Sequence, residues 1–213
     1  MATQSLEERI QRMEDIHEIQ NIMGRYEYLH TAGKQEETAE LFARKTPGVT
    51  AEIANWGVYE GYEGVRKLYV GLHNYIEGDR KGQLNMHTLT TPVLEVAGDG
   101  KTAKGVWLSP GSETTKVRGK PQAFWAWCKY GVDFVKEDGK WRIWHFHVYG
   151  VFHTPYEKSW TESPKFERSY VPDELKTDKP SSRPFWVYSP ETTTDDAPMP
   201  PAPYETWDGK SMA

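Results

Sequence analysis

The chain has 213 residues, with 26 lysines and arginines against 31 aspartates and glutamates and a net charge of −5. This acidic balance is the opposite of the basic surface that binds nucleic acid. No apolar run approaches the roughly 20 residues of a membrane span, and the first residues do not resemble a secretory signal. We therefore expect a cytoplasmic protein without nucleic-acid or membrane partners.

The first predicted element is a long helix. Ser5 and Glu8 form a capping box, and apolar residues then recur at intervals of three and four as far as Tyr26. Gly33 is the candidate C-cap residue that ends this helix. Two further helices are predicted over residues 35–42 and 65–77, with a strand over residues 50–59 between them.

Four strands follow the helices. Pro92 predicts a bulge or an edge position within the first strand, and Asp138-Gly139 predicts the hairpin before the last. Helices followed by strands in hairpin order indicate the α+β class, in which the helices pack on one face of a curved antiparallel sheet. The strands are predicted over residues 85–96, 103–109, 122–135 and 141–152.

Proline usage divides the chain, because residues 1–150 contain 4 prolines and residues 151–213 contain 10. We predict one domain over residues 1–152 and a C-terminal extension over residues 153–213. A disordered tail would lack aromatic residues, and this extension carries nine of them. We expect an ordered, irregular arm that packs on the core or on a neighbouring subunit of a homo-oligomer, a dimer or a trimer.

Four phrases resemble the SnoaL-like branch of the NTF2-like superfamily, namely residues 19–26, 87–96, 98–103 and 138–145. The branch includes polyketide cyclases, scytalone and bile-acid dehydratases and ketosteroid isomerases, and some aromatic-dimer lyases that release formaldehyde are similar to it. The resemblance covers about residues 10–152. It implies a cone in which the sheet wraps around the N-terminal helices, a deep pocket at the open end, and chemistry without a cofactor.

The same resemblance implies functional residues. The pocket histidine of the family matches His87, and the last-strand histidine or arginine matches His145. Dehydratases of the branch often pair a first-helix tyrosine with an aspartate five residues later, but here Tyr26 is followed at that spacing by Thr31. The family's acid is therefore absent from that position.

Strand alternation adds further candidates. The last strand places His145 and His147 on the face of Trp141, which resembles the cavity face of the family. His145-x-His147 with His87 could also form a metal site, but we expect no metal. The residues expected to bind substrate are Tyr28, Thr31, Trp56, Trp107, Tyr130, Trp141 and His147.

Histidine can take and return a proton near neutral pH. The sequence-based hypothesis is that His87 or His145 is the general base and that Tyr26 or Tyr28 stabilises the developing charge. The predicted function is a cofactor-independent lyase that removes water or a small carbonyl, such as formaldehyde, from an aromatic or polycyclic hydroxylated molecule. The alternatives are an isomerase or cyclase with the same base, or a small-molecule binding protein without catalysis.

Overall fold

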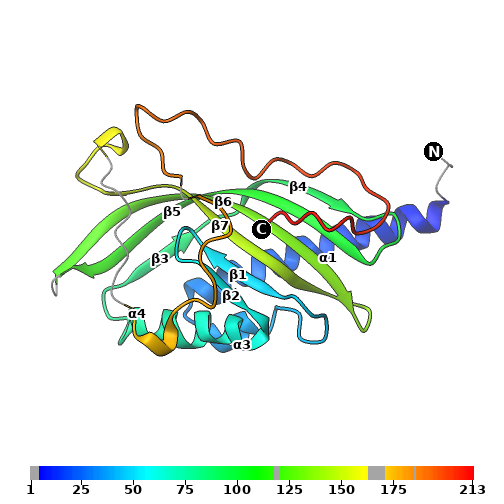
Figure 1. Cartoon of the computed structure of the whole chain (residues 1–213), viewed down its shortest axis with the longest axis horizontal. Coiled ribbons are helices and arrows are strands. Elements are labelled where there is room, and N and C mark those ends of the chain that lie inside the picture. Colours follow the sequence, from blue (N-terminus) through cyan, green and yellow to red (C-terminus); the bar gives the residue numbers. More distant parts are fainter. Residues whose placement is uncertain (1–4, 118–119, 163–170, 185) are drawn as a thin grey trace.

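A curved sheet forms the centre of the computed structural model, which describes residues 5–117, 120–162, 171–184 and 186–213 (Figure 1). Within these residues the sheet has seven strands in the order β2-β1-β7-β6-β5-β3, and β4 also pairs with β5. Every pairing is antiparallel except β1 with β7, so the sheet is mixed. The strands are β1 (Thr50–Ile53), β2 (Val58–Glu60), β3 (Leu84–His87), β4 (Thr90–Val96), β5 (Thr102–Val117), β6 (Lys120–Glu137) and β7 (Lys140–Pro155).

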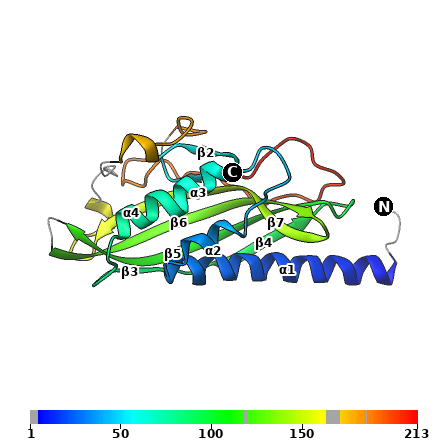
Figure 2. The ribbon, with the colours of Figure 1, turned by 90° about the horizontal axis from the view of Figure 1, so that it is seen from below.

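Helix α1 (Leu6–Thr31) runs along the inner face of this sheet (Figure 2). The predicted capping box of Ser5 and Glu8 is confirmed, and Gly33 follows the helix with φ +67°. The buried residues Ile19, Met23 and Tyr26 recur at helical spacing and face the sheet. Neither α1 nor any other helix in the described part of the chain is long and apolar enough to cross a bilayer.

The other helices differ in length from their predictions. Helix α2 (Gln35–Ala39) is shorter, because the backbone at Leu41 and Phe42 pairs with Ile143 of β7 instead. The third predicted helix begins earlier, at Gly61, and has a π-helical segment at its centre. Its parts are α3 (Gly61–Arg66), η1 (Lys67–His73) and α4 (Asn74–Glu77), and two short 3-10 turns lie at η2 (Trp160–Glu162) and η3 (Asp173–Leu175).

The single strand predicted over residues 50–59 is wrong, because β1 and β2 form an antiparallel pair. Between them Ala54 and Gly57 have φ of +47° and +108°, which turns the chain. A Cβ atom at position 57 would also lie 2.5 Å from the carbonyl oxygen of Lys179. Glycine is therefore required there both for the backbone conformation and for the space. The predicted irregularity at Pro92 is confirmed as a register shift between Thr90 and Val93.

A bulge in β7 decides which histidines face the helices. Asp133 pairs with His145, whereas the next residue of β6, Phe134, pairs with Ile143, so Trp144 is an extra residue in β7. Such a bulge reverses the alternation of side chains beyond it. Trp141 and Ile143 face the helices, but His145 and His147 face outward. The prediction that His145 and His147 share the face of Trp141 is therefore wrong.

The outward face of the sheet is covered by the segment 186–213, which crosses β5 to β7 (Figure 1). Its contacts use charged side chains that the strands direct outward. Lys129 donates hydrogen bonds to the carbonyl oxygens of Asp195 and Ala197, and Lys104 pairs with Asp208 at 2.9 Å. Sheet residues that would otherwise be solvated therefore anchor this segment.

Candidate active site

Titratable side chains from α1 and three strands meet between α1 and the sheet. Glu27 comes from α1, His87 from β3, Glu113 from β5 and His153 from β7. Glu27 and His87 lie close enough for the charge of His87 to act on the Glu27 carboxyl, and Glu113 hydrogen-bonds both histidines. We call these four residues the carboxylate–histidine cluster.

Glu27 is the member of the cluster whose hydrogen-bonding capacity is least used. The residue is 7% exposed, and no donor among the described residues stands in regular hydrogen-bonding geometry to either carboxylate oxygen, although the Tyr130 hydroxyl is close enough to act on the carboxyl. Burial raises its pKa to about 7, against the opposing influence of His87 and of the Tyr130 hydroxyl. Glu27 lies one helical turn beyond Met23, so the apolar stripe of α1 itself carries this carboxyl into the interior. A carboxyl with a pKa near neutral can accept and release a proton under ordinary conditions.

Glu113 bridges the two histidines. Its Oε1 lies 3.1 Å from Nε2 of His87, and its Oε2 lies 3.0 Å from Nε2 of His153. Burial alone would raise the pKa of Glu113, but the hydrogen bonds from His153 and His87 outweigh it and hold that pKa well below its usual range. Glu113 is therefore an anion, and each histidine donates its Nε2 proton to it.

The surroundings of His87 favour its charged form. Burial lowers its proton affinity, but the hydrogen bond and charge of Glu113 and the charge of Glu27 raise its pKa above the ordinary value. Its Nδ1 is buried and has no hydrogen-bond partner among the residues that the structure describes. Gly111 lies directly opposite on β5, where an added Cβ would approach that Nδ1 to 2.4 Å. The glycine at position 111 therefore leaves the space that the His87 ring occupies.

Phenol side chains pack beside the cluster. The Tyr69 hydroxyl donates a hydrogen bond to the Tyr26 hydroxyl at 3.0 Å, and the rings of Tyr130 and Phe146 pack on Tyr26. Burial raises the pKa of Tyr26 and of Tyr130 well above the usual value. Both phenols therefore stay protonated and remain hydrogen-bond donors at neutral pH.

Two further buried histidines stand next to these phenols. His30 stacks on Tyr26 and lies 4.9 Å from the His73 ring, centroid to centroid. Burial lowers the pKa of His30 to about 4 and that of His73 well below its ordinary value, so both rings are neutral at pH 7. Nε2 of His30 lies 3.2 Å from the side-chain amide of Asn85.

Three of the residues expected to bind substrate lie in this region or in its aromatic wall. Tyr130 is buried against Tyr26, as its strand parity predicted. Trp107 is buried and packs on Phe134, with the ring centroids 6.2 Å apart. Trp56 packs edge-on against His73, at a centroid distance of 6.3 Å.

Three other expected binding residues lie elsewhere. Tyr28 is 83% exposed, because two residues beyond Tyr26 a helical side chain points to the opposite side. Thr31 lies at the end of α1, where its carbonyl oxygen accepts a hydrogen bond from Arg80. Trp141 is buried against the other end of α1, where its Nε1 donates to Asp15 at 2.8 Å. Asp15 is about 18 Å along the helix from Glu27.

The outward-facing histidines of β7 lie against carboxylates of the neighbouring strands on the outer side of the sheet. Nδ1 of His145 lies 2.9 Å from Asp133, which also accepts hydrogen bonds from the Ser211 hydroxyl and the backbone N–H of Met212. Nδ1 of His147 lies 3.6 Å from Glu52. We therefore withdraw His145 as a candidate base, and His147 as a substrate contact.

Sequence reasoning did not find Glu27, Glu113 or His153. The signal for Glu27 was its place four residues after Met23 on the buried stripe. The strand predicted over residues 103–109 ended too early. The alternation of Trp107, Ser109 and Gly111, continued beyond that end, would have placed Glu113 on the same face. His153 carried no comparable signal, because its orientation depends on a second register shift, between Trp127 and Cys128.

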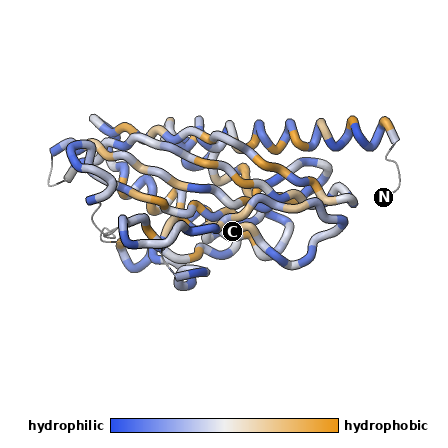
Figure 3. The backbone as a smooth tube through the Cα atoms, turned by 90° about the horizontal axis from the view of Figure 1, so that it is seen from above, coloured by the Kyte–Doolittle hydropathy of each residue, from blue (hydrophilic) through white to orange (hydrophobic). Residues whose placement is uncertain are grey.

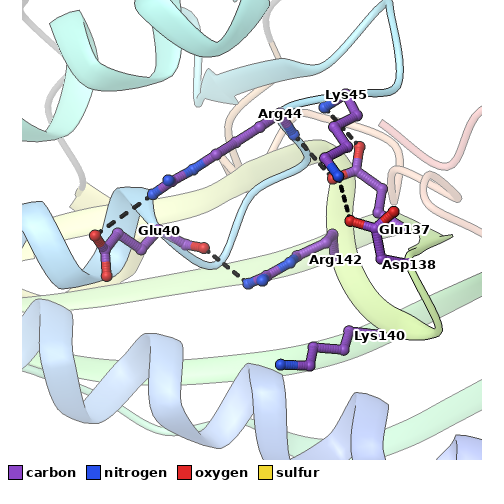
Figure 4. A pocket seen from close by; sticks show the side chains of 7 residues that line it. All are labelled: Glu40, Arg44, Lys45, Glu137, Asp138, Lys140 and Arg142. Carbon is purple, nitrogen blue, oxygen red and sulfur yellow. Dashed lines mark hydrogen bonds and ion pairs between the residues drawn. The ribbon is translucent and has the colours of Figure 1, made fainter.

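A surface depression elsewhere on the molecule is a different kind of site (Figure 4). It measures about 380 Å³ and is lined only by charged residues from around α2 and the β6–β7 hairpin. Glu137 accepts hydrogen bonds from the backbone N–H groups of Arg44, Lys45 and Thr46, so its charge serves the local fold. Among the residues that the structure describes, no three His, Cys, Asp or Glu side chains are arranged to hold a metal ion.

Comparisons with known proteins agree with this architecture. The family model described as a SnoaL-like domain matches residues 11–147. No curated protein matches the chain.

Three solved structures illustrate the shared fold. A putative scytalone dehydratase from Novosphingobium aromaticivorans has a TM-score of 0.58 at 15% identity, covering 76% of this chain and 99% of that one. LinA has a TM-score of 0.60 at 16% identity, covering 70% and 95%. A hexachlorocyclohexane dehydrochlorinase, LinA-type3, from Novosphingobium barchaimii has a TM-score of 0.57 at 15% identity, covering 70% and 94%.

Proposed function

Because this chain belongs to the SnoaL-like domain family, we propose that its carboxylate–histidine cluster is the active site of a cofactor-independent lyase. The observation that carries the proposal is Glu27, a buried carboxyl with no well-formed hydrogen bond to any described residue and a pKa raised to about 7 by burial. An unpaired buried acid costs stability, so its presence argues for a functional role. The substrate would be a small hydrophobic molecule with an aromatic ring and a hydroxyl group.

The roles follow from the protonation states. In the loss of water, the Glu27 carboxylate takes a proton from carbon, the electron pair of that C–H bond becomes the double bond, and the C–O bond breaks. Protonated His87 gives its proton to the departing hydroxyl, which leaves as water. Tyr26 and Tyr130 remain protonated and can donate hydrogen bonds to a substrate oxygen on which charge develops.

A small carbonyl could be lost by the same groups. The base would then take the hydroxyl proton, the C–C bond would break, and formaldehyde would leave as its C=O bond forms. The remaining carbon would take a proton from His87. Trp56 and the aromatic side chains around Tyr26 offer flat apolar surface for the substrate ring.

The neighbouring folds support elimination as the reaction type. They include a putative scytalone dehydratase and a hexachlorocyclohexane dehydrochlorinase, and both names describe the removal of a small molecule from a larger one. With identities of 15% the likeness concerns the fold, so the reaction of this chain rests on its own residues.

One observation favours a second candidate, an isomerase. The hydrogen-bonded pair of Tyr69 and Tyr26 resembles the donors that stabilise an enolate while a carboxylate moves a proton from one carbon to another. In that case Glu27 would take and return the same proton, and no group would leave.

A substrate panel tests the proposed function. The purified protein, with and without a chelator, is incubated with aryl compounds that carry a β-hydroxyl or a hydroxymethyl group. We expect new conjugated double bonds by absorbance, or formaldehyde by colorimetry, at a rate that the chelator does not change. Migration of a double bond without loss of mass would instead indicate the isomerase. Specific binding with no conversion of any panel member would contradict catalysis.

A further inference from the structure

Buried polar atoms whose hydrogen-bonding capacity is unused gather around the proposed base. Besides the Glu27 carboxylate, Nδ1 of His87 and Oγ of Ser109 form no hydrogen bond with any residue that the structure describes. Ser109 is 1% exposed, and the side chain of His87 is 10% exposed. Buried polar groups are almost always hydrogen-bonded in folded proteins, so such atoms in one place indicate a site for a polar atom of a ligand.

The register of β5 places Ser109 on the same face as the carboxylate–histidine cluster. Gly111 lies opposite His87 of β3, and Ser109, two residues away on β5, lies opposite Cys128 of β6. Residues two apart in a strand point to the same side of the sheet. The charge of Glu27 acts on the Cys128 thiol, so the residue across from Ser109 lies within electrostatic reach of the proposed base.

The spacing along β5 leaves room for one oxygen atom between Ser109 and His87. Nδ1 of His87 lies over position 111, since a Cβ atom added there would be 2.4 Å from it. Ser109 is two residues along the strand, a rise of about 7 Å. Two successive hydrogen bonds of about 2.8 Å, together with the length of a serine side chain, cover that span. Gly111 adds no side chain between the two groups.

We propose that Ser109 and Nδ1 of His87 together bind the hydroxyl oxygen of the substrate, which makes Ser109 a residue that selects substrates with a hydroxyl at this position. This inference rests on the proposed function. Protonated His87 donates a hydrogen bond from Nδ1 to the oxygen, and Oγ of Ser109 accepts the hydrogen that the hydroxyl carries. A hydroxyl can donate one hydrogen bond and accept two, so one atom satisfies both groups.

The two contacts act together when water leaves. As the C–O bond breaks, its electron pair goes to the oxygen, which takes the Nδ1 proton of His87 and becomes water. One hydrogen of that water remains hydrogen-bonded to Ser109. Ser109 forms no covalent bond and gains no charge, so its effect is to orient the leaving group. An analogue without the hydroxyl would leave both polar groups unpartnered, and a site of this kind discriminates against it.

Two probes that differ by one hydroxyl test the contact. Tyrosol and para-ethylphenol are the same aryl compound with and without the side-chain hydroxyl. Their dissociation constants are measured by NMR titration in Glu27→Gln, in which no turnover is expected. Adding Ser109→Ala should weaken tyrosol binding by about 3- to 10-fold and leave para-ethylphenol binding unchanged. Ser112→Ala, on the opposite face of β5, is the matched control and should change neither constant.

Stability distinguishes this role from a structural one. Ser109→Ala should leave the free energy of unfolding unchanged or higher, because the hydroxyl that it removes has no partner among the described residues. A less stable variant would show that the hydroxyl serves the fold, and would overturn the proposal. If Ser109→Ala does not fold, Ser109→Cys allows the same comparison of probes, because a thiol is a weak hydrogen-bonding group.

The binding data can also contradict the proposal. Equal weakening of the two probes, an unchanged affinity for tyrosol, or failure of both probes to bind would each overturn the Ser109 contact. The two proposals fail separately. Loss of affinity for tyrosol alone, in a protein that converts no panel member, would contradict the lyase. Turnover with a kcat/KM that Ser109→Ala does not change would contradict the Ser109 contact alone.

Discussion

Replacing Glu27 by glutamine should abolish turnover, with a loss of about 10² to 10⁴-fold, while the fold is preserved. Glutamine has nearly the shape of glutamic acid but cannot accept the substrate proton. The measurement is kcat on the substrate that the panel identifies. Glu18→Gln, an exposed position on the same helix, is the matched control and should keep full activity. A Glu27→Gln variant with more than a tenth of normal turnover would exclude Glu27 as the base.

The same substitution should increase stability. The folded chain holds the Glu27 proton more tightly than the unfolded chain, because burial raises the pKa from 4.5 to about 7. Native-state stability therefore declines as the pH rises from 4.5 through 7, and above that range the ionised carboxylate costs up to about 3 kcal/mol. Glutamine carries no charge, so denaturant unfolding at pH 8 should show a gain that is absent at pH 4. This opposite movement of stability and activity is characteristic of functional residues.

Replacing Asp133 by alanine should produce the largest loss of stability, about 3 to 5 kcal/mol. Asp133 is fully buried and accepts hydrogen bonds from His145, the Ser211 hydroxyl and the backbone N–H of Met212. Without it these donors lose their acceptor beneath the C-terminal segment. Chemical denaturation measures the loss, and hydrogen exchange at residues 205–213 should rise at the same time.

The control for this prediction lies in the same segment. Asp208→Ala removes a pair with Lys104 in which the aspartate side chain is 42% exposed and the lysine side chain 8%, so we expect a loss smaller than that of the fully buried Asp133. Equal losses in the two variants, or an unchanged exchange rate at residues 205–213 in Asp133→Ala, would show that Asp133 does not anchor the C-terminal segment.

Local sequence signals predicted much of the fold. The capping box at Ser5 depends on atoms within one helical turn, and the β6–β7 hairpin depends on Asp138-Gly139, whose φ angles are both positive. The irregularity at Pro92 follows from its missing N–H. Each of these features is set by residues adjacent in sequence, so the sequence alone is sufficient to place them.

The orientation of the last strand could not be predicted in the same way. Trp144 is an extra residue only with respect to the pairing of β7 with β6. Asp133 pairs with His145 and Phe134 pairs with Ile143, so Trp144 has no partner in that ladder. Alternation read from β7 alone therefore placed His145 in the interior, whereas the structure turns it toward Asp133. His87 lies on the short strand β3 and hydrogen-bonds Glu113, and its catalytic role stays a prediction.

The carboxyl of the site escaped prediction for a different reason. The family resemblance directed attention to the position five residues after Tyr26, where this chain has Thr31. The acid that we propose for this chain is instead the next residue, Glu27, which the buried stripe of α1 brings beside His87. If charged residues had been included when the buried stripe of the first helix was traced, Glu27 would have been identified.

The central claim is that Glu27 is a buried base whose proton is exchanged near neutral pH, and the most direct test is its own titration. Carboxyl groups labelled with ¹³C at glutamate can be followed by NMR from pH 3 to 9, with the Glu27 signal assigned by its absence in Glu27→Gln. We predict a midpoint near pH 7, because burial disfavours the carboxylate and outweighs the influence of His87 and Tyr130. A midpoint near 4.5, the ordinary value for glutamate, would contradict the account.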